Sequence, residues 1–494
     1  MKTKNIFIAF ILLICINFSC SEFLQEDPKS ILAPSTYPSS EAEVLQIFGG
    51  VSTTINGLTK TRWHLLETST DILSTQSLPG EASGDLDHYT FQPDNGNFLS
   101  MWQGNYKIIN TMNLMIDRLE SLDESWVTPY VGAAKALRAF AYFELVQTFG
   151  DLPILTIPSS EVDLFEIKRE PVSKVYEQIV MDLTSAETNL QGKTWTNVLL
   201  PSYGFTKSLL AKVYMTMAGN PVNDISKWSL AALKAKEVVD LKIYQLVKPY
   251  SDLWLIAKEN SKEHIYSSQP AYNGAASTLN ANIRPQNIGV QRGNGESTTF
   301  IEFYNEFSSN DTRRNVSILT EILSTTGSTG GNPKIYYYTS WGTTPKERFP
   351  AVGKYFDSGR AYEDWQKYSR NVGNNFPLLR YSDVLLTLAE SENEANGPTE
   401  LAYSAINQIR ERAGISLLSG LTQSEFRDSV RFERKKELCF ECQRRFDLLR
   451  WGTFLTVMVL DPYAGPNVKS HHVLFPIPYV ERLVNPNLEQ NPGY

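Results

Sequence analysis

Apolar residues recur at helical spacing through much of the first half of the chain. In the segment 129–149 they return at intervals of three and four residues, which places them on one face of a helix. This face comprises Ala134, Leu137, Ala141 and Leu145. Small residues on such a face suit close packing against a second helix, and Gly150 marks the end of the helix.

Further helices are predicted as neighbouring pairs. The segments 202–218 and 227–239 are separated by the turn Gly219-Asn220-Pro221. Near the C-terminus, one helical face runs from Leu378 to Leu388, and Gly397-Pro398 separates that helix from the next, over 402–413. Helical hairpins of this size are the unit of a tetratricopeptide array. A third helix is predicted to start at a capping box formed by Thr422 and Glu425.

Residues 271–375 interrupt this pattern. The stretch is rich in glycine and aromatic residues and has no sustained period, and such a long stretch without regular structure is unusual unless it has a function. The prediction is a mainly α fold in which tetratricopeptide-like helical pairs, about 40–270 and 376–494, carry a long irregular insertion. Residues 20–494 are predicted to form a single domain.

The N-terminus has the pattern of a lipoprotein signal peptide. Lys2 and Lys4 precede eleven apolar residues, which are too few to span a bilayer, since a span takes roughly 20. Ser19 provides the small residue that signal peptidase needs before a cysteine, so residues 1–19 are predicted to be removed and Cys20 to be acylated. Two or three acyl chains would anchor the protein stably. Ordinary secretion with an incidental Cys20 is the alternative.

The negative charge balance argues against a protein that binds nucleic acid. The formal net charge of the 494 residues is −8, and no run of Lys and Arg with interleaved aromatics compensates for it. The sequence also contains no nucleophile elbow, Walker motif, dinucleotide fingerprint or zincin motif, and no cofactor is predicted. A glycosidase carboxylate pair has no local signature and stays open.

The predicted third C-terminal helix contains the strongest candidate for an active site or a metal site. Glu433, Glu437 and Glu441 lie at i, i+4 and i+8 on one face, where three carboxylates could bind a metal or share a proton. Arginines and lysines crowd the same helix, and Arg410 and Arg412 end the previous one. We therefore expect a structural salt-bridge ladder with arginines of this helix or of the 402–413 helix, and no metal site.

Four C-terminal segments, in this order, resemble the SusD/RagB-like outer-membrane lipoproteins of Bacteroidetes. These segments are "LRYSDVLLTLAESENEANG" (379–397), "AINQIRERAGI" (405–415), "ERKKELCFECQRRFDLLRWG" (433–452) and "FPIPYVERLVNPNLEQNPGY" (475–494). Weaker matches, such as "WQGNYKIINTMNLMIDRLE" (102–120), extend the resemblance over essentially the whole chain after residue 20.

The resemblance implies a function as well as a fold. Such proteins capture glycans, or in some members peptides, outside the cell and pass them to a SusC-like TonB-dependent channel in the outer membrane. As a rule they are not enzymes. The alternatives are a glycan-cleaving surface lipoprotein and a helical scaffold that binds only protein.

Cys439 and Cys442 form a C-x-x-C pair. The resemblance and the helix geometry both indicate that the two side chains pack in the core and do not form a disulfide. Similar proteins carry small residues at these positions. Both cysteines are predicted to lie inside the helix that starts at Thr422, where Cβ atoms three residues apart are about 5–6 Å apart, whereas a disulfide needs about 3.8 Å. We expect two buried thiols that act as small hydrophobic side chains.

Ligand contacts are expected from aromatic residues outside the helical pairs, because sugar C–H faces stack on aromatic rings while their hydroxyls need polar neighbours. Two regions offer both kinds of side chain: Asp85 to Phe91, and the insertion. The strongest candidate is Trp341, with Tyr337 on the same face if that segment is extended. The full set of candidates is His88, Tyr89, Tyr272, Asn273, Arg292, Tyr337 and Trp341.

Overall fold

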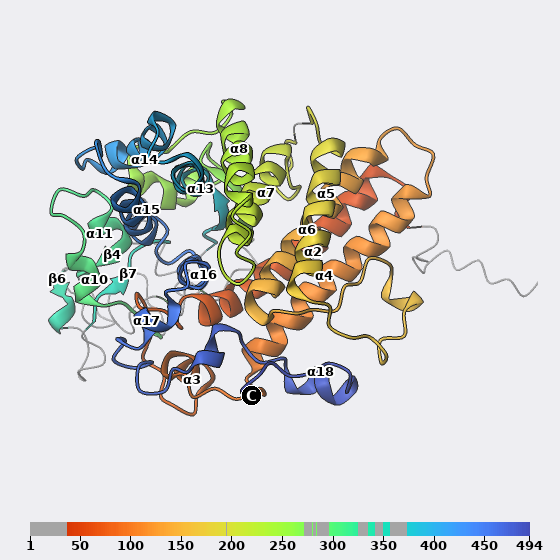
Figure 1. Ribbon diagram of the computed structural model, residues 1–494, viewed down its shortest axis with the longest axis horizontal. Helices are drawn as coiled ribbons and strands as arrows, with labels where there is room; N and C mark the ends of the chain where they lie inside the picture. Colours follow the sequence, from red (N-terminus) through yellow and green to blue (C-terminus); the bar gives the residue numbers. More distant parts are fainter. Residues whose placement is uncertain are drawn as a thin grey trace, which may run out of the picture.

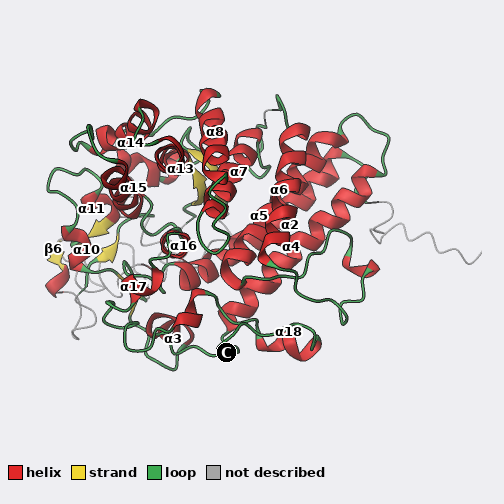
Figure 2. Ribbon diagram, viewed as in Figure 1, coloured by secondary structure: helices red, strands yellow, loops and turns green. Residues whose placement is uncertain are grey.

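Helices are the main regular elements of the computed structural model (Figures 1 and 2). The structure describes residues 37–193, 195–270, 279, 283, 296–324, 334–340, 349–355 and 373–494. The longer helices are α2 (Glu41–Leu66), α4 (Gly96–Glu120), α5 (Val127–Phe149), α6 (Val172–Asn189), α7 (Tyr203–Ala218), α8 (Lys227–Asp240), α13 (Tyr381–Asn396), α14 (Glu400–Ala413) and α15 (Gln423–Glu437). The shorter ones are α3 (Ala82–His88), α10 (Ile301–Asn305), α11 (Arg314–Ser317), α16 (Arg444–Arg450), α17 (Phe454–Met458) and α18 (Tyr479–Val484).

Successive helices pack as neighbours, which confirms the predicted helical pairs. Helix α5 lies between α4 and α6, and α7 packs against α8. Helix α13 contacts α8, α14 and α15, so the C-terminal helices continue the row that the N-terminal helices begin. Figure 1 shows this row from α4 at the right to α14 at the left.

The core of the row is dense because α5 is buried nearly all round. All four residues of its predicted apolar face, including Ala134 and Leu137, are completely buried. Gly150 ends the helix with φ of 78°, a conformation that glycine adopts at little cost. The sequence prediction for this helix is therefore confirmed.

The C-terminal helices agree with the prediction except at their ends. The capping box of Thr422 and Glu425 is present at the start of α15. Leu378, however, belongs to the strand β8 (Phe376–Arg380) and not to the helix that follows it. Helix α15 also ends at Glu437, so Cys439, Glu441 and Cys442 lie beyond it.

Strand pairing brings the two ends of the predicted insertion together. Strand β2 (His264–Ser268), just before residue 271, pairs antiparallel with β8, which begins just after residue 375. The insertion therefore leaves the helical scaffold and returns to it at one place.

The described parts of the insertion contain short regular elements, although the sequence predicted none. Strand β1 (Ser74–Thr75) pairs with β3 (Ser297–Thr298), and β4 (Ile318–Leu319) pairs with β7 (Ala351–Val352). A hairpin is formed by β5 (Glu321–Ser324) and β6 (Lys334–Tyr337). Runs of two to four residues are too short to leave a periodic pattern in the sequence.

Across the part of the chain that the structure describes, none of the helices has the length and apolarity needed to cross a membrane.

Candidate functional site

Glu437, the last residue of α15, lies in a fully buried cluster of arginines. Arg380 Nη1 is 2.7 Å from Oε1 of Glu437, and Arg313 Nη1 is 3.0 Å from Oε2. Arg412 also donates to Oε1. The four side chains are 0–1% exposed. Three elements far apart in sequence are thus joined at one carboxylate.

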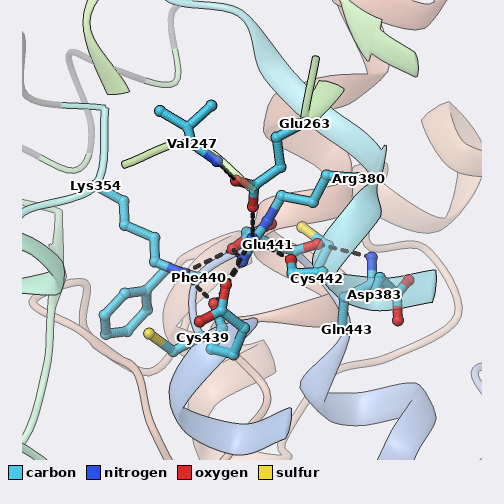
Figure 3. A network of polar contacts seen from close by, with 12 residues as sticks. Val247, Glu263, Lys354, Arg380, Asp383, Cys439, Phe440, Glu441, Cys442 and Gln443 are labelled. Carbon is cyan, nitrogen blue, oxygen red and sulfur yellow. Dashed lines mark hydrogen bonds and ion pairs between the residues drawn. The ribbon is translucent and has the colours of Figure 1, made fainter. Parts of the chain in front are cut away.

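Glu441 and Glu263 extend this network on either side of Arg380 (Figure 3). Arg380 Nε lies 2.6 Å from Glu441 Oε2, and Arg380 Nη1 lies 2.7 Å from Glu263 Oε1. Lys354 Nζ lies 2.6 Å from the other oxygen of Glu441. Since Lys354 and Arg313 come from the insertion, the network fastens the insertion to the scaffold.

The arginines keep the buried carboxylate of Glu437 charged. Burial alone would raise the pKa of Glu437, but Arg412, Arg380 and Arg313 hold that pKa well below its ordinary value. A carboxylate that is already neutralised by three cations and closed to solvent has no capacity left to abstract a proton or bind a metal. Among the described residues, no group of three or more His, Cys, Asp or Glu side chains is arranged to hold a metal ion.

The predicted salt-bridge ladder is confirmed, and it has more partners than the sequence predicted. Arg410 and Arg412 of α14 pair with Glu433 and Glu437, as expected. Two arginines near these glutamates in the sequence pair with other residues. Arg434 of α15 forms ion pairs with Asp383 and Asp447, and Arg444 of α16 forms one with Asp71. The partners that sequence reasoning missed are Arg313, Lys354 and Arg380, which are distant in the chain.

The two cysteines are buried free thiols, but they lie in a turn and not inside a helix. Cys439 is 1% and Cys442 4% exposed. Burial raises the pKa of the Cys439 thiol to about 11 and that of Cys442 well above its ordinary value. High pKa values make both thiols poor nucleophiles, so the prediction of buried small hydrophobic side chains is confirmed and the predicted helical position is wrong.

A half-buried aromatic face joins the predicted Asp85–Phe91 region to the insertion. Strand β1 contacts α3, which contains Asp85 and His88, and it pairs with β3 of the insertion, so the two regions are neighbours. Tyr463 contacts both, because its ring centroid is 5.5 Å from that of His88 and 6.4 Å from that of Phe300. We call His88, Phe300 and Tyr463 the aromatic face. All three are partly exposed to solvent.

Sequence reasoning named neither Phe300, which lies in the insertion, nor Tyr463, which lies outside both predicted regions. The backbone N–H of Tyr463 and that of Ala464 donate to Asp461 Oδ1, at 2.9 and 2.8 Å. This turn projects the tyrosine from the loop after α17. An aromatic residue between Pro462 and Gly465 was the available signal, since proline and glycine mark turns.

Tyr89 does not offer its ring to a ligand, so the prediction for this residue is wrong. It is 3% exposed, and its hydroxyl donates to Ser69 O at 2.7 Å. Arg445 Nη1 donates in turn to that hydroxyl at 2.9 Å. The ring packs inside the core between Phe91 and Phe454.

Tyr337 is the last residue of β6, where it lies opposite Glu321. A 3-10 turn, Tyr338–Ser340, follows at once. The extended segment that was expected to place Tyr337 and Trp341 on one face therefore ends at Tyr337. Trp341 lies outside the described residues, as do Cys20, Tyr272, Asn273 and Arg292.

Comparison with known proteins matches both halves of the chain. The sequence model of the SusD family covers residues 257–494, and a second, described as "Starch-binding associating with outer membrane", covers residues 22–215. The chain belongs to the SusD family. SusD-like protein P25 of Formosa agariphila is 27% identical over 558 residues, covering 100% of both chains.

Two further proteins resemble this chain, one in its whole fold and one in a stretch of its sequence. A SusD superfamily crystal structure from Parabacteroides distasonis aligns with a TM-score of 0.81 at 26% identity, covering 92% of this chain and 100% of that one. The starch-binding protein SusD of Bacteroides thetaiotaomicron is 31% identical over 155 residues, which are 28% of this chain and 27% of SusD. The mainly α, helical-pair fold expected from the sequence is thereby confirmed.

Proposed function

We propose that this SusD-family protein binds carbohydrate at the outer membrane without cleaving it. The observation that carries the proposal is the aromatic face of His88, Phe300 and Tyr463, which lies outside the helical pairs and stays partly open to solvent. The similarity to the starch-binding protein SusD and the family description of starch binding support the same ligand class.

The aromatic face has the chemistry that a sugar ring requires. The Phe300 and Tyr463 rings are nearly parallel, with 26° between their planes, and offer an apolar platform for sugar C–H groups. His88 Nδ1 donates to Gly84 O at 2.8 Å, so in the neutral ring Nε2 is left as a hydrogen-bond acceptor. A hydroxyl group of the sugar is the matching donor.

We propose that the face continues into the insertion through Tyr272, Asn273, Arg292, Tyr337 and Trp341. Aromatic rings there would extend the stacking platform, and Arg292 and Asn273 would donate hydrogen bonds to ring oxygens and hydroxyls. An oligomeric glycan is then the expected ligand, because a single ring cannot reach so many side chains.

Two further steps complete the proposed role. The bound glycan is handed to a SusC-like TonB-dependent transporter, and acyl chains on Cys20 anchor the protein in the outer membrane, facing the cell surface. For the anchor, the intact mass of the membrane-extracted protein is expected to show loss of residues 1–19 plus the mass of the acyl chains. A Cys20→Ala protein that stays wholly in the membrane fraction without its transporter would contradict acylation.

The ligand class is tested on the soluble chain that begins at residue 21. A glycan array should give hits among polysaccharides and long oligosaccharides, and titration calorimetry should then give their affinities. No hits, together with tight binding to the transporter, would favour a protein-binding scaffold instead. New reducing ends after incubation with a bound polysaccharide would identify a glycosidase.

A further inference from the structure

A pocket of about 430 Å³ lies where the C-terminal helices α16 and α17 meet the ends of α5, α6 and α7. Its volume is within the roughly 300–1,000 Å³ of pockets that bind small molecules. Pro221 and Gly452 belong to its lining and are exposed, so the pocket opens to solvent between the loops that follow α7 and α16. Most of the lining is apolar: Val146, Val172, Pro221, Phe446, Leu449, Phe454, Leu455, Val473 and Leu474.

Backbone hydrogen bonds fix the walls of this pocket. The N–H of Asn220, after α7, donates to Arg450 O of α16 at 2.9 Å. The N–H of Phe475, next to Leu474 of the lining, donates to Thr148 O of α5, also at 2.9 Å. Each bond ties a C-terminal segment to an N-terminal helix, so the pocket is preformed, and a preformed site binds at a lower entropy cost.

Tyr176 of α6 brings a hydroxyl without a partner into the apolar lining. Its side chain is 2% exposed, and none of the described residues forms a hydrogen bond with its hydroxyl. Two other tyrosines of the helical row, Tyr106 and Tyr142, each donate to a backbone carbonyl at 2.9 Å. Buried polar groups are almost always hydrogen-bonded. A ligand in the pocket would supply the partner that Tyr176 lacks.

Gln147 of α5 offers an acceptor close to this hydroxyl. Its Nε2 donates to Phe143 O at 3.0 Å, and its Oε1 accepts from none of the described residues. The Phe143 ring centroid is 6.4 Å from that of Tyr176, and Gln147 follows Phe143 by one turn of α5. One acceptor and one hydroxyl together satisfy a single hydroxyl group of a ligand, which both donates and accepts.

The lining provides no counter-charge for an ionised ligand. Among its described residues the charged side chain is Arg450, which is already paired: its two Nη atoms each lie 2.6 Å from an oxygen of Glu390. Its Nε donates to Asp447 Oδ1 at 3.0 Å. An unpaired charge is costly to remove from water, so the pocket favours an uncharged ligand.

We propose that this pocket binds an uncharged aromatic molecule that carries a phenolic hydroxyl. The rings of Phe446 and Phe454 line it, and aromatic pairs contribute stabilisation beyond the burial of apolar area. The ligand hydroxyl donates to Gln147 Oε1 and accepts from the Tyr176 hydroxyl. The site is separate from the aromatic face, whose three residues are absent from its described lining.

Titration calorimetry with 2-naphthol tests the proposal on the soluble chain that begins at residue 21. One molecule is expected to bind per chain, and Tyr176→Phe should weaken binding about fivefold, the effect of losing one hydrogen bond. Tyr214→Phe is the control, because Tyr214 is a buried tyrosine of α7 outside the described lining, and its affinity should match the wild type. Failure of 2-naphthol to bind, or equal affinity in Tyr176→Phe and the wild type, would overturn the proposal.

A second variant locates the bound molecule. Leu455 is a partly exposed residue of the lining, and Leu455→Trp fills the pocket with an indole ring. It should abolish 2-naphthol binding and keep the wild-type circular dichroism spectrum, whereas Tyr463→Ala should not affect the binding. Loss of binding in Tyr463→Ala, or undiminished binding in a folded Leu455→Trp protein, would place the molecule elsewhere and overturn the site. If Leu455→Trp does not fold, Tyr176→Phe decides.

Two further compounds test the chemical class. The ring system of 2-naphthoate is the same, but its carboxylate is ionised at neutral pH, so it should bind at least tenfold more weakly than 2-naphthol. The aliphatic alcohol 1-decanol keeps the hydroxyl and lacks the ring, and it should also bind more weakly. Binding of either compound as tightly as 2-naphthol would overturn the assignment of an uncharged phenol.

Discussion

Arg380 Nη1 and Glu437 Oε1 lie 2.7 Å apart, although 57 residues separate them in the chain. The pair joins the strand that closes the insertion to the end of α15. Because Arg313 and Lys354 reach the same network from inside the insertion, one buried cluster fixes the insertion to the helices.

Replacing Glu437 by Gln should destabilise the protein strongly. The substitution leaves Arg380, Arg412 and Arg313 buried with too little negative charge, and removing one partner of a buried ion pair typically costs about 3–5 kcal/mol. Chemical denaturation should show this loss in the free energy of unfolding, while oligosaccharide affinity below the melting temperature stays the same.

The control for this substitution is Glu411→Gln. Glu411 is 67% exposed and 3.8 Å from Lys248, so its ion pair is screened by water and the melting temperature should not move. Unchanged melting in Glu437→Gln together with lost ligand binding would instead assign Glu437 to the binding site.

Because of the carboxyl group of Glu67, the free energy of unfolding should fall as the pH rises. Glu67 is completely buried, and burial raises its pKa from 4.5 to about 8. Between these two values the folded chain holds a proton that the unfolded chain has released, so the free energy of unfolding falls with pH, by at most about 1.4 kcal/mol per unit.

Glu67→Gln should abolish this part of the pH dependence. Glutamine keeps an oxygen for the N–H of Cys442, which now donates to Glu67 Oε1, and it has no charge to gain. Denaturation curves from pH 5 to 8 should therefore show the variant gaining stability relative to the wild type. Parallel curves for the two proteins would mean that Glu67 is charged in the folded state.

Cys439 and Cys442 should resist thiol reagents in the folded protein. Both are buried with raised pKa values, so the reactive thiolate is scarce at neutral pH. Ellman's reagent is expected to react with neither thiol before denaturation and with both afterwards, and a reductant should not change the melting temperature. Rapid labelling in buffer would show that the turn opens.

The sequence predicts the helices well where the signals are local. The apolar face of α5 and the capping box of α15 depend on residues within a few positions of each other, and both are confirmed. The end of α15 lacks such a signal. Phe440 and Cys442 take positive φ values of 62° and 59° there without a glycine to mark the turn.

Long-range contacts account for the other differences between prediction and structure. Nothing near Glu437 in the sequence points to Arg313 or Arg380, and nothing near His88 points to Tyr463, because these contacts depend on the path of the whole chain. Tyr89 shows the converse case. It shares a short polar and aromatic stretch with His88, yet the left-handed backbone at Tyr89, with φ of 56°, turns it into the core.

Tyr463→Ala should weaken carbohydrate binding, because Tyr463 is the ring that links His88 to Phe300. Loss of one stacking ring is expected to cost on the order of 1–3 kcal/mol, by analogy with base stacking on aromatic side chains. Titration calorimetry with an oligosaccharide identified on the glycan array measures the change, and Phe300→Ala should act in the same direction. Tyr479→Ala is the control, since Tyr479 is 50% exposed but belongs to α18 and not to the aromatic face. Wild-type affinity in Tyr463→Ala and Phe300→Ala would move the site to the segment that holds Trp341, and Trp341→Ala is then expected to weaken binding.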